Sequence, residues 1–318
     1  MKLIVQIACL NEEQTLPQTL RDIPRELDGV DEIEVLVVDD GSSDRTAQVA
    51  REAGADHVVR LRRNVGLARA FMLGLDESLR RGADIIVHTD ADNQYDARDI
   101  AALIAPILDG SADVVVGSRP IEAIREFSFW KKKLQRLGSW VVRGVSRTSL
   151  PDATSGFRAY SKGAALRLTI LSEFTYTLES VIQAGHTNVA VAHVPIRTNP
   201  ATRQSRLAAS SWQYVWRSLG TIIRIYVLYE PFRFFMRLGL LVFLAGFALC
   251  ARYLYFYFRG DSGHLQSVIL GAVLVILGFQ LGIVGLLADL LAANRKLVQE
   301  ALFRVRRLEL ERSDSSEV

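Results

Sequence analysis

A short run of oxygen-bearing side chains follows a strongly apolar stretch in the first third of the chain. Residues 85–87 are Ile-Ile-Val, and the sequence continues as His-Thr-Asp-Ala-Asp-Asn-Gln. Asp90 and Asp92 carry carboxylates and Gln94 carries an amide, so three oxygen ligands follow the end of a buried strand. This donor set suits a hard divalent cation, Mg²⁺ or Mn²⁺, that would hold a diphosphate. An isolated Asp-x-Asp motif is as often a solvated acidic turn as a metal site, so the rest of the chain must distinguish these two interpretations.

Short apolar runs alternate with helical spacing over about the first 200 residues. The predicted strands are residues 3–8, 34–38, 57–60, 85–89 and 114–117. Helical spacing covers residues 13–26, 44–53, 66–80 and 97–108. Alternation at this interval predicts an α/β domain, in which a mostly parallel sheet is covered by helices on both faces.

Polar clusters stand at the ends of three predicted strands. They are Asn11-Glu12, the Asp-Asp-Gly-Ser-Ser-Asp segment 39–44, and the segment 90–94. The carboxyl ends of parallel strands share one edge of a sheet, and ligands bind beyond that edge. We therefore expect the three clusters to converge. Asp44 also precedes a helical pattern, and capping of that helix is its structural interpretation.

Two long apolar segments occupy the last third of the chain. Residues 232–258 and 265–294 are each long enough to cross ~30 Å of hydrocarbon as a helix. Arg237 and Arg252 interrupt the first segment and could snorkel to its ends. The connection 259–264 is short and polar, which predicts an antiparallel hairpin with both ends on one side. A hairpin buried in a soluble core is the alternative, and two consecutive spans this apolar disfavour it.

The charged residues set the expected orientation of this hairpin. Positive-inside bias predicts an inner-membrane protein with its large N-terminal domain and both termini in the cytoplasm. No signal peptide is expected, because the N-terminus lacks a basic and then apolar leader. Cys9 and Cys250 lie in different regions and suggest neither a disulfide nor a zinc site. The net charge of +3 is unremarkable, and no nucleic-acid partner is expected. The basic residues outside the hairpin are Arg217, Arg224, Arg233, Arg295, Lys296, Arg304, Arg306 and Arg307.

Four regions follow from these patterns. Residues 1–202 form the cytoplasmic α/β domain, and residues 236–294 form the transmembrane hairpin. Between them, residues 203–235 alternate Arg with Trp, Tyr and aliphatic residues, which predicts helices in the membrane interface. Ordinary packing against the soluble domain is the alternative for these helices. Residues 295–318 read as a charged helical tail, either a homo-oligomer contact or a solvated end.

Several motifs in a fixed order resemble the family 2 glycosyltransferases of the polyprenyl-phosphate type. This group includes dolichyl-phosphate mannose synthases and bacterial undecaprenyl-phosphate glycosyltransferases. The resemblance covers about residues 5–235, and it implies a Rossmann-like GT-A fold followed by interfacial helices and a two-helix hairpin. The motifs are IACLNEE (7–13), VVDDGSSD (37–44), NVGLARA (64–70), TDADNQ (89–94), GSR (117–119), DATSGFR (152–158) and TNPATRQSRL (198–207).

The activity implied by this resemblance is metal-dependent transfer of one hexose from a UDP- or GDP-sugar to a polyprenyl phosphate. Asp39 would accept a hydrogen bond from the base, which suits the imide N–H of uracil or guanine. Asp40 would support that loop or the ribose. Many relatives carry Pro-x-Tyr where residues 8–10 here read Ala-Cys-Leu, so this strand end departs from the pattern that contacts the base. The implied nucleotide-sugar site comprises Ala8, Leu10, Glu12, Asp39, Asp40, Asp90 and Ala91.

The implied catalytic residues are Asp92, Asp152 and Arg119. Asp90, Asp92 and Gln94 would hold Mg²⁺ or Mn²⁺, which would act as a Lewis acid on the departing nucleoside diphosphate. Asp152 would orient the acceptor, and the following residues 154–156 would form the loop under the sugar.

The predicted acceptor, a lipid phosphate, is already an anion near neutral pH and needs no strong general base. Cations should line its site, and the candidates are Arg119, Lys132, Arg203 and Arg206. Lys132 lies in a run of three lysines that could equally be solvated. Arg203 and Arg206 could instead anchor the chain to lipid head groups.

Two other functions remain open at this point. Transfer to another lipid acceptor, such as a hydroxyl, would require a general base, and Asp152 is the candidate. A non-catalytic membrane scaffold with a degenerate fold is the second, and the intact Asp90, Asp92 and Gln94 set argues against it. A polymer-extruding synthase is disfavoured because the chain lacks a Gln-x-x-Arg-Trp motif. No motif reveals the sugar.

Overall fold

The computed structural model describes residues 1–119, 150–170, 176–187, 189–200, 220, 223–224, 226–260 and 265–316. The chain divides into two compact units. The first comprises Met1–Ser218 with Ala301–Val318, and the second comprises Leu219–Glu300. Each unit is described below by itself.

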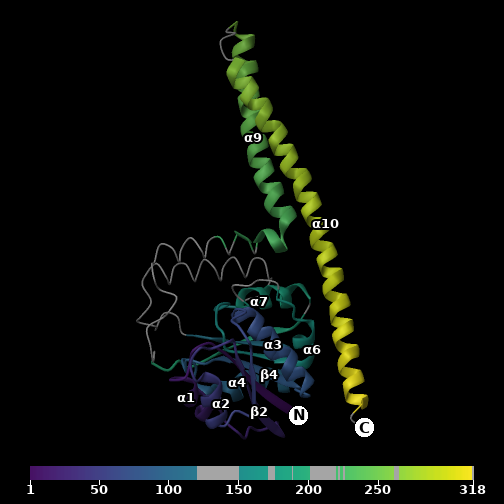
Figure 1. The fold of residues 1–318 in the computed structure, drawn as a ribbon. Helices are drawn as coiled ribbons and strands as arrows, with labels where there is room; N and C mark the ends of the chain where they lie inside the picture. The colour runs from purple at the N-terminus through teal and green to yellow at the C-terminus, as the bar shows by residue number, and fades with distance from the viewer. Residues whose placement is uncertain are drawn as a thin grey trace. The chain divides into compact units, whose positions relative to one another are not determined.

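A seven-stranded sheet forms the centre of the first unit (Figure 1). Its strand order is β3-β2-β1-β4-β6-β5-β7. β1 pairs in parallel with β2 and β4, and β5 pairs in parallel with β7, whereas β6 is antiparallel to both its neighbours. The predicted mostly parallel sheet is confirmed. The strands are β1 (Lys2–Cys9), β2 (Glu32–Asp39), β3 (His57–Arg60), β4 (Ile85–Asp90), β5 (Val114–Ser118), β6 (Arg158–Ser161) and β7 (Val191–Pro195).

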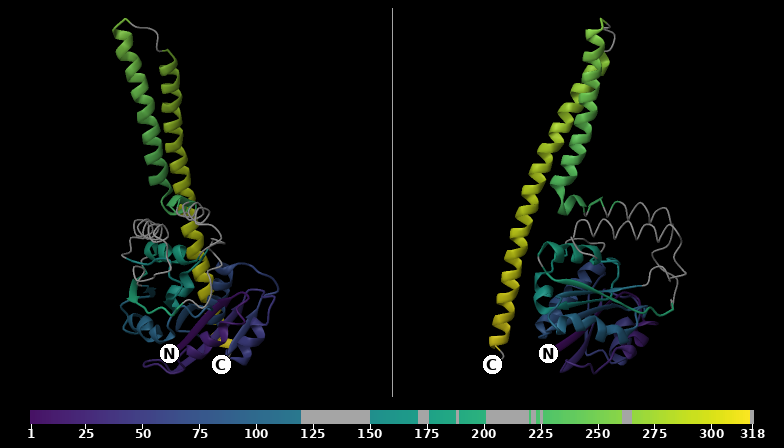
Figure 2. Two further views of the ribbon diagram at one scale, coloured as in Figure 1. Left: turned by 90° about the vertical axis from the view of Figure 1, so that its left-hand side faces the viewer. Right: turned by 180° about the vertical axis from the view of Figure 1, so that it is seen from behind.

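Helices cover both faces of the sheet, as predicted (Figure 2). Alternate β1 residues Leu3, Val5 and Ile7 join one core cluster that also contains buried residues of the helices α1, α2 and α4. The opposite β1 positions face α3, where Gly74 leaves room for the Gln6 side chain. The period of two along the strand therefore assigns each side chain to one layer. The helices of this unit are α1 (Leu16–Asp22), α2 (Thr46–Glu52), α3 (Leu67–Arg80), η1 (Ala97–Asp99), α4 (Ile100–Leu108), α6 (Lys162–Arg167) and α7 (Thr177–His186).

The strands β6 and β7 were not predicted from the sequence. β6 has only four residues and begins with Arg158, whose side chain is completely buried. Its guanidinium donates to the carbonyl oxygens of Ala153 (2.7 Å), Ser155 (2.8 Å) and Thr177 (2.7 Å). These carbonyl oxygens accept hydrogen bonds from the buried guanidinium and offset the cost of removing it from water. A search for apolar runs in the sequence treats an arginine as exposed and therefore does not find this strand.

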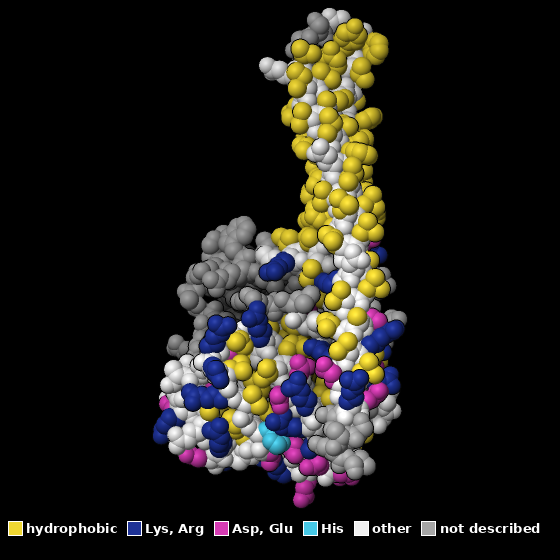
Figure 3. All heavy atoms as spheres, turned by 45° about the vertical axis from the view of Figure 1, so that its right-hand side comes forward, with side chains coloured by type: hydrophobic (Ala, Val, Ile, Leu, Met, Phe, Trp, Pro, Cys, Tyr) yellow, Lys and Arg dark blue, Asp and Glu magenta, His cyan; other side chains and the backbone are white. Residues whose placement is uncertain are grey.

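The second unit contains two long helices, α9 (Pro231–Phe258) and the first part of α10 (Leu265–Ser316). Both are long and apolar enough to cross a membrane. Their large apolar side chains are exposed, Leu241 by 67% and Phe279 by 67%, and Figure 3 shows apolar side chains over the visible surface of this helical pair. A hairpin buried in a soluble core would hide these side chains, so the exposure favours the membrane interpretation. α10 also continues without a break through the charged residues 295–316.

Glycines bring α9 and α10 into close backbone contact. A Cβ atom added to Gly246 would lie 2.7 Å from the carbonyl oxygen of Gly271. A Cβ atom added to Gly239 would lie 2.7 Å from the carbonyl oxygen of Gly278. Because lipid offers no hydrophobic drive for helix association, small residues that allow close packing stabilise such pairs.

We expect Gly246→Leu to destabilise the helical pair by about 1–3 kcal/mol, because the new side chain collides with the facing backbone. Thermal unfolding in detergent measures this effect. Gly282→Leu is the matched control, since nothing lies within 4 Å of a Cβ added to Gly282. Equal unfolding temperatures for the two variants would contradict the glycine contact.

Candidate active site

The sheet brings the three polar clusters to one edge. Register pairs Cys9 with Asp39 on one side of β1, and Ala8 with Asp90 on the other. Beyond β1, the Asn11 N–H donates to Ser42 Oγ (2.9 Å), and Asn11 Oδ1 accepts from the Ser43 N–H (2.9 Å). The loops after β1 and β2 are therefore directly bonded, and the loop after β4 begins beside them.

Asp39 is completely buried at the end of β2. Its Oδ1 accepts from the Ser42 N–H (2.8 Å), while Oδ2 has no hydrogen-bond partner among the described residues. Arg60 Nε lies 3.4 Å from Oδ2 and compensates part of its charge. A buried acceptor oxygen without a donor is costly, so an imide N–H at this position fits the residue.

Asp40, at the same edge, connects the end of β2 to the segment before α3. Its two carboxylate oxygens accept from the Val65 N–H (2.7 Å) and the Gly66 N–H (3.0 Å), just before α3. This geometry favours loop support over a ribose contact for Asp40. Asp44 is likewise engaged by backbone, since it accepts from the Thr46 N–H (3.0 Å) where α2 begins.

The other predicted nucleotide residues have little free side chain. Ala8 and Ala91 are buried, and the Ala91 carbonyl accepts from Thr19 Oγ1 (3.1 Å). The buried Glu12 accepts from Thr15 Oγ1 (2.8 Å). Leu10 is half-buried. Ala8 and Ala91 have only a methyl group each, so a nucleotide would meet backbone and shape there rather than a polar side chain.

Asp90 ends β4 in crowded surroundings but remains open to solvent, with 36% of its side chain exposed. Gly156 lies against it, because a Cβ there would be 2.8 Å from Asp90 Oδ2. The Tyr95 hydroxyl accepts from the Gly156 N–H (2.9 Å). Desolvation of the partly covered carboxylate, reinforced by the charge of nearby Asp92, raises the pKa of Asp90 to about 7.

A carboxylate whose ionisation is disfavoured by a nearby negative charge is receptive to a cation. Among the described residues no three His, Cys, Asp or Glu side chains gather as a metal cluster. The predicted donor set contains two carboxylates, Asp90 and Asp92, with the Gln94 amide as its third oxygen. Such a set suits Mg²⁺ or Mn²⁺, which keep several water ligands. The Gln94 N–H donates to Asp92 Oδ1 (3.2 Å), which shapes this loop.

Arg119 and Asp152 form a buried pair at the end of β5. Arg119 Nε donates to Asp152 Oδ2 (2.7 Å), and Nη2 donates to Oδ1 (3.1 Å) and to Thr154 Oγ1 (2.9 Å). Burial opposes ionisation of Asp152, but the Arg119 guanidinium outweighs it and holds the pKa of that carboxyl below its usual range. Asp152 is thus a stable anion and a weak proton acceptor. Lys132, Arg203 and Arg206, the other predicted acceptor cations, lie outside the described residues.

Aromatic residues around Asp90 were missed by the sequence reasoning. Tyr176 stacks on Phe71 of α3 with ring centroids 4.1 Å apart, and His88 meets Tyr176 edge-on at 5.1 Å. Burial lowers the pKa of His88 to about 3, so this histidine stays neutral beside Asp90. Tyr95 stacks on Phe157 (5.2 Å). A tyrosine directly after the Asp-x-Asp-x-Gln segment was the one available signal.

Comparison with known proteins agrees with this geometry. Residues 4–169 match the family described as Glycosyl transferase family 2. The chain is 28% identical over 204 residues to polyprenol monophosphomannose synthase of Mycolicibacterium smegmatis, covering 61% of this chain and 76% of that protein. It is 30% identical over 217 residues to the UDP-N-acetylglucosamine–dolichyl-phosphate N-acetylglucosaminyltransferase of Methanococcus voltae, covering 60% and 83%.

The fold is similar to that of glucosyl-3-phosphoglycerate synthase from Mycobacterium tuberculosis, crystallised with Mn²⁺, UDP and glucosyl-3-phosphoglycerate. The TM-score is 0.55 at 22% identity, over 70% of this chain and 79% of that chain. This likeness identifies the GT-A fold. The match over more than half of the chain establishes the family: the chain belongs to glycosyl transferase family 2 and is a glycosyltransferase.

Proposed function

We propose that the protein transfers one hexose from a UDP- or GDP-sugar to a polyprenyl phosphate in a metal-dependent reaction. The observation that carries the proposal is the pairing of Asp152 with Arg119 beside the Asp90 and Asp92 carboxylates. It combines a candidate cation site on the donor side with an acceptor side where Asp152, the candidate base, is already engaged by Arg119. The membrane-type hairpin and the polyprenyl-phosphate and dolichyl-phosphate relatives support a lipid acceptor.

On the donor side, Asp90, Asp92 and Gln94 would hold the divalent cation. The bound ion would neutralise charge on the departing nucleoside diphosphate. Asp39 would accept the imide N–H of the base through its buried Oδ2, and Asp40 would keep the surrounding loop closed on the segment before α3. Asp40 is thus a loop-holding residue.

On the acceptor side, the chemistry depends on which group attacks the sugar. A hydroxyl acceptor would need a base that takes up its proton. Asp152 is poorly suited, because Arg119 engages both its oxygens and stabilises the anion. A phosphate is already ionised and needs only orientation and charge compensation. Arg119, whose charge Asp152 balances, would orient the phosphate at this edge, and Lys132, Arg203 and Arg206 are the further predicted cations.

The proposed location follows from the two apolar helices. The α9 and α10 hairpin would cross the cell membrane twice, with the catalytic unit and both termini in the cytoplasm. Basic residues that flank the apolar spans support this orientation. The water-soluble donor and the lipid-borne acceptor would then meet at the inner face of the bilayer.

Asp92→Asn should lower the transfer rate at least about 100-fold, because a metal ligand worth several kcal/mol in the transition state is lost. The measurement uses the detergent-purified protein with Mn²⁺, undecaprenyl phosphate and radiolabelled UDP-sugars or GDP-mannose, and it counts labelled lipid. Asp28→Asn, at an exposed position before β2, is the matched control. Undiminished activity of the Asp92 variant would refute the metal assignment, and no lipid product from the wild type with any donor would refute the proposed reaction.

The apparent affinity for Mn²⁺ should rise with pH up to about 7 and level off above it. Without the metal, Asp90 has a pKa raised to about 7, so below that pH the ion must displace a proton. Affinity should fall by up to about tenfold per pH unit below 7. Calorimetric titration with Mn²⁺ and UDP or GDP between pH 5.5 and 8 measures the affinity and the released proton. A pH-independent affinity over this range would show that Asp90 does not ligate the ion.

A further inference from the structure

The loop that carries the predicted metal ligands has an unfavourable backbone conformation at its centre. Asn93 lies between Asp92 and Gln94 and has a φ of +53°, in the left-handed region that favours glycine. Its Nδ2 donates to Asp22 Oδ2 (3.0 Å) on α1, which fixes one side of the loop. A non-glycine residue keeps such a conformation only where its surroundings hold it there.

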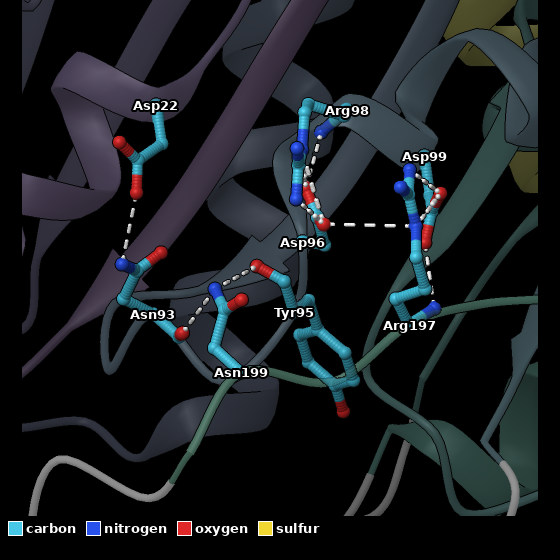
Figure 4. A network of polar contacts seen from close by, with 8 residues as sticks. All are labelled: Asp22, Asn93, Tyr95, Asp96, Arg98, Asp99, Arg197 and Asn199. Carbon is cyan, nitrogen blue, oxygen red and sulfur yellow. Dashed lines mark hydrogen bonds and ion pairs between the residues drawn. The ribbon is translucent and has the colours of Figure 1, made fainter.

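Asn199 holds the other side of this loop from a distant part of the chain (Figure 4). Its backbone N–H donates to the Gln94 carbonyl (2.9 Å). Its side-chain Nδ2 donates to the carbonyls of Asn93 (3.0 Å) and Tyr95 (3.4 Å). One residue therefore satisfies three consecutive carbonyl oxygens that surround the position of Gln94.

Asn199 is itself fixed by the residues before it. The Ile196 N–H donates to the Ser118 carbonyl (3.0 Å), and the Ile196 side chain is buried in the core. Arg197 binds Asp99 through its backbone N–H (2.6 Å) and its Nε (2.9 Å). Pro200 follows Asn199 and restricts it to an extended backbone. Asn199 thus reaches the loop from a support anchored to the sheet edge and to η1.

We propose that Asn199 is a positioning residue for the divalent-cation site. This inference rests on the proposed function and extends it to a residue outside the predicted ligand set. A small cation requires its oxygen ligands within a few tenths of an ångström of their ideal places. Asn199 fixes the backbone on either side of Gln94, and the hydroxyl of Tyr95, whose carbonyl it also holds, accepts from the N–H of Gly156, which packs against Asp90. The loop that carries Asp92 and Gln94 is therefore held directly by this one amide, and the surroundings of Asp90 are held through Tyr95.

Asn199→Leu tests the proposal, because it keeps the size and the backbone N–H but removes the amide donors. We expect Mn²⁺ binding in the presence of UDP or GDP to weaken about tenfold, as two lost hydrogen bonds to carbonyls would imply. The Mn²⁺ concentration for half-maximal transfer should rise by the same factor. At saturating Mn²⁺ the turnover rate should return to within about twofold of wild type, which a general loss of structure would not produce.

Arg98→Gln is the matched control in the same network. The Arg98 guanidinium binds Asp96 (2.6 Å), away from the carbonyls that Asn199 holds (Figure 4). The Arg98→Gln variant should bind Mn²⁺ with the same affinity as wild type. Thermal unfolding of this variant and of Asn199→Leu measures any general destabilisation. Should Asn199→Leu not yield folded protein, Arg197→Gln replaces it and should weaken Mn²⁺ binding about threefold relative to Arg98→Gln.

The outcomes separate this inference from the function on which it rests. If Asn199→Leu binds Mn²⁺ as tightly as the wild-type protein, the positioning role is overturned and the proposed reaction is left intact. Equal weakening in Arg98→Gln would also overturn it, since the effect would then belong to the whole network. Wild-type protein that binds no Mn²⁺ with either nucleotide would overturn both proposals.

Discussion

The parallel pairing of β1 with β2 on one side and β4 on the other is the constraint on which the site depends. Register places Cys9 beside Asp39 and Ala8 beside Asp90, so two acidic strand ends lie on either side of the same short segment. Residues 35–38 of β2 and 85–89 of β4 are buried just before these carboxylates, so a shift by one residue would exchange their side chains between the two helical layers. Hydrophobic burial therefore sets the spacing of the polar groups at the edge.

Charge at this edge is organised in two parts with different behaviour. Desolvation and the charge of Asp92 disfavour ionisation of Asp90, which makes this corner receptive to a cation. Arg119 and Asp152 are already neutralised as a buried pair, so neither is available as a strong acid or base. Removing either partner of such a pair would leave an uncompensated charge, which is costly away from water. The arrangement suits a reaction between two phosphate-bearing substrates, in which orientation and charge compensation matter more than proton transfer.

Both the glycine contacts between α9 and α10 and the Asn199 contacts hold two backbone segments close together, but they do so by different means. In the helical pair, the absence of a side chain at each glycine lets the two backbones approach closely. At the sheet edge, a polar side chain satisfies carbonyls that a strained turn leaves exposed. The glycine contacts require only a seven-residue spacing along one helix, as between Gly239 and Gly246. The Asn199 contacts require that a distant segment of the chain return to the loop after β4.

The sequence alone determined the features that depend on neighbouring residues, namely the strands, the helices and the polar clusters at strand ends. Apolar periodicity located β1 to β5 and the two long helices, and the oxygen-bearing clusters after three strands predicted the sheet edge at which these clusters meet. Only the tertiary structure decided how distant side chains pair. Arg119 meets Asp152 across 33 positions, Asn199 meets Asn93 across 106, and the antiparallel β6 enters between β4 and β5 with a buried arginine. The physical reason is that periodicity records which face of an element is buried, while these contacts depend on where the chain returns in space.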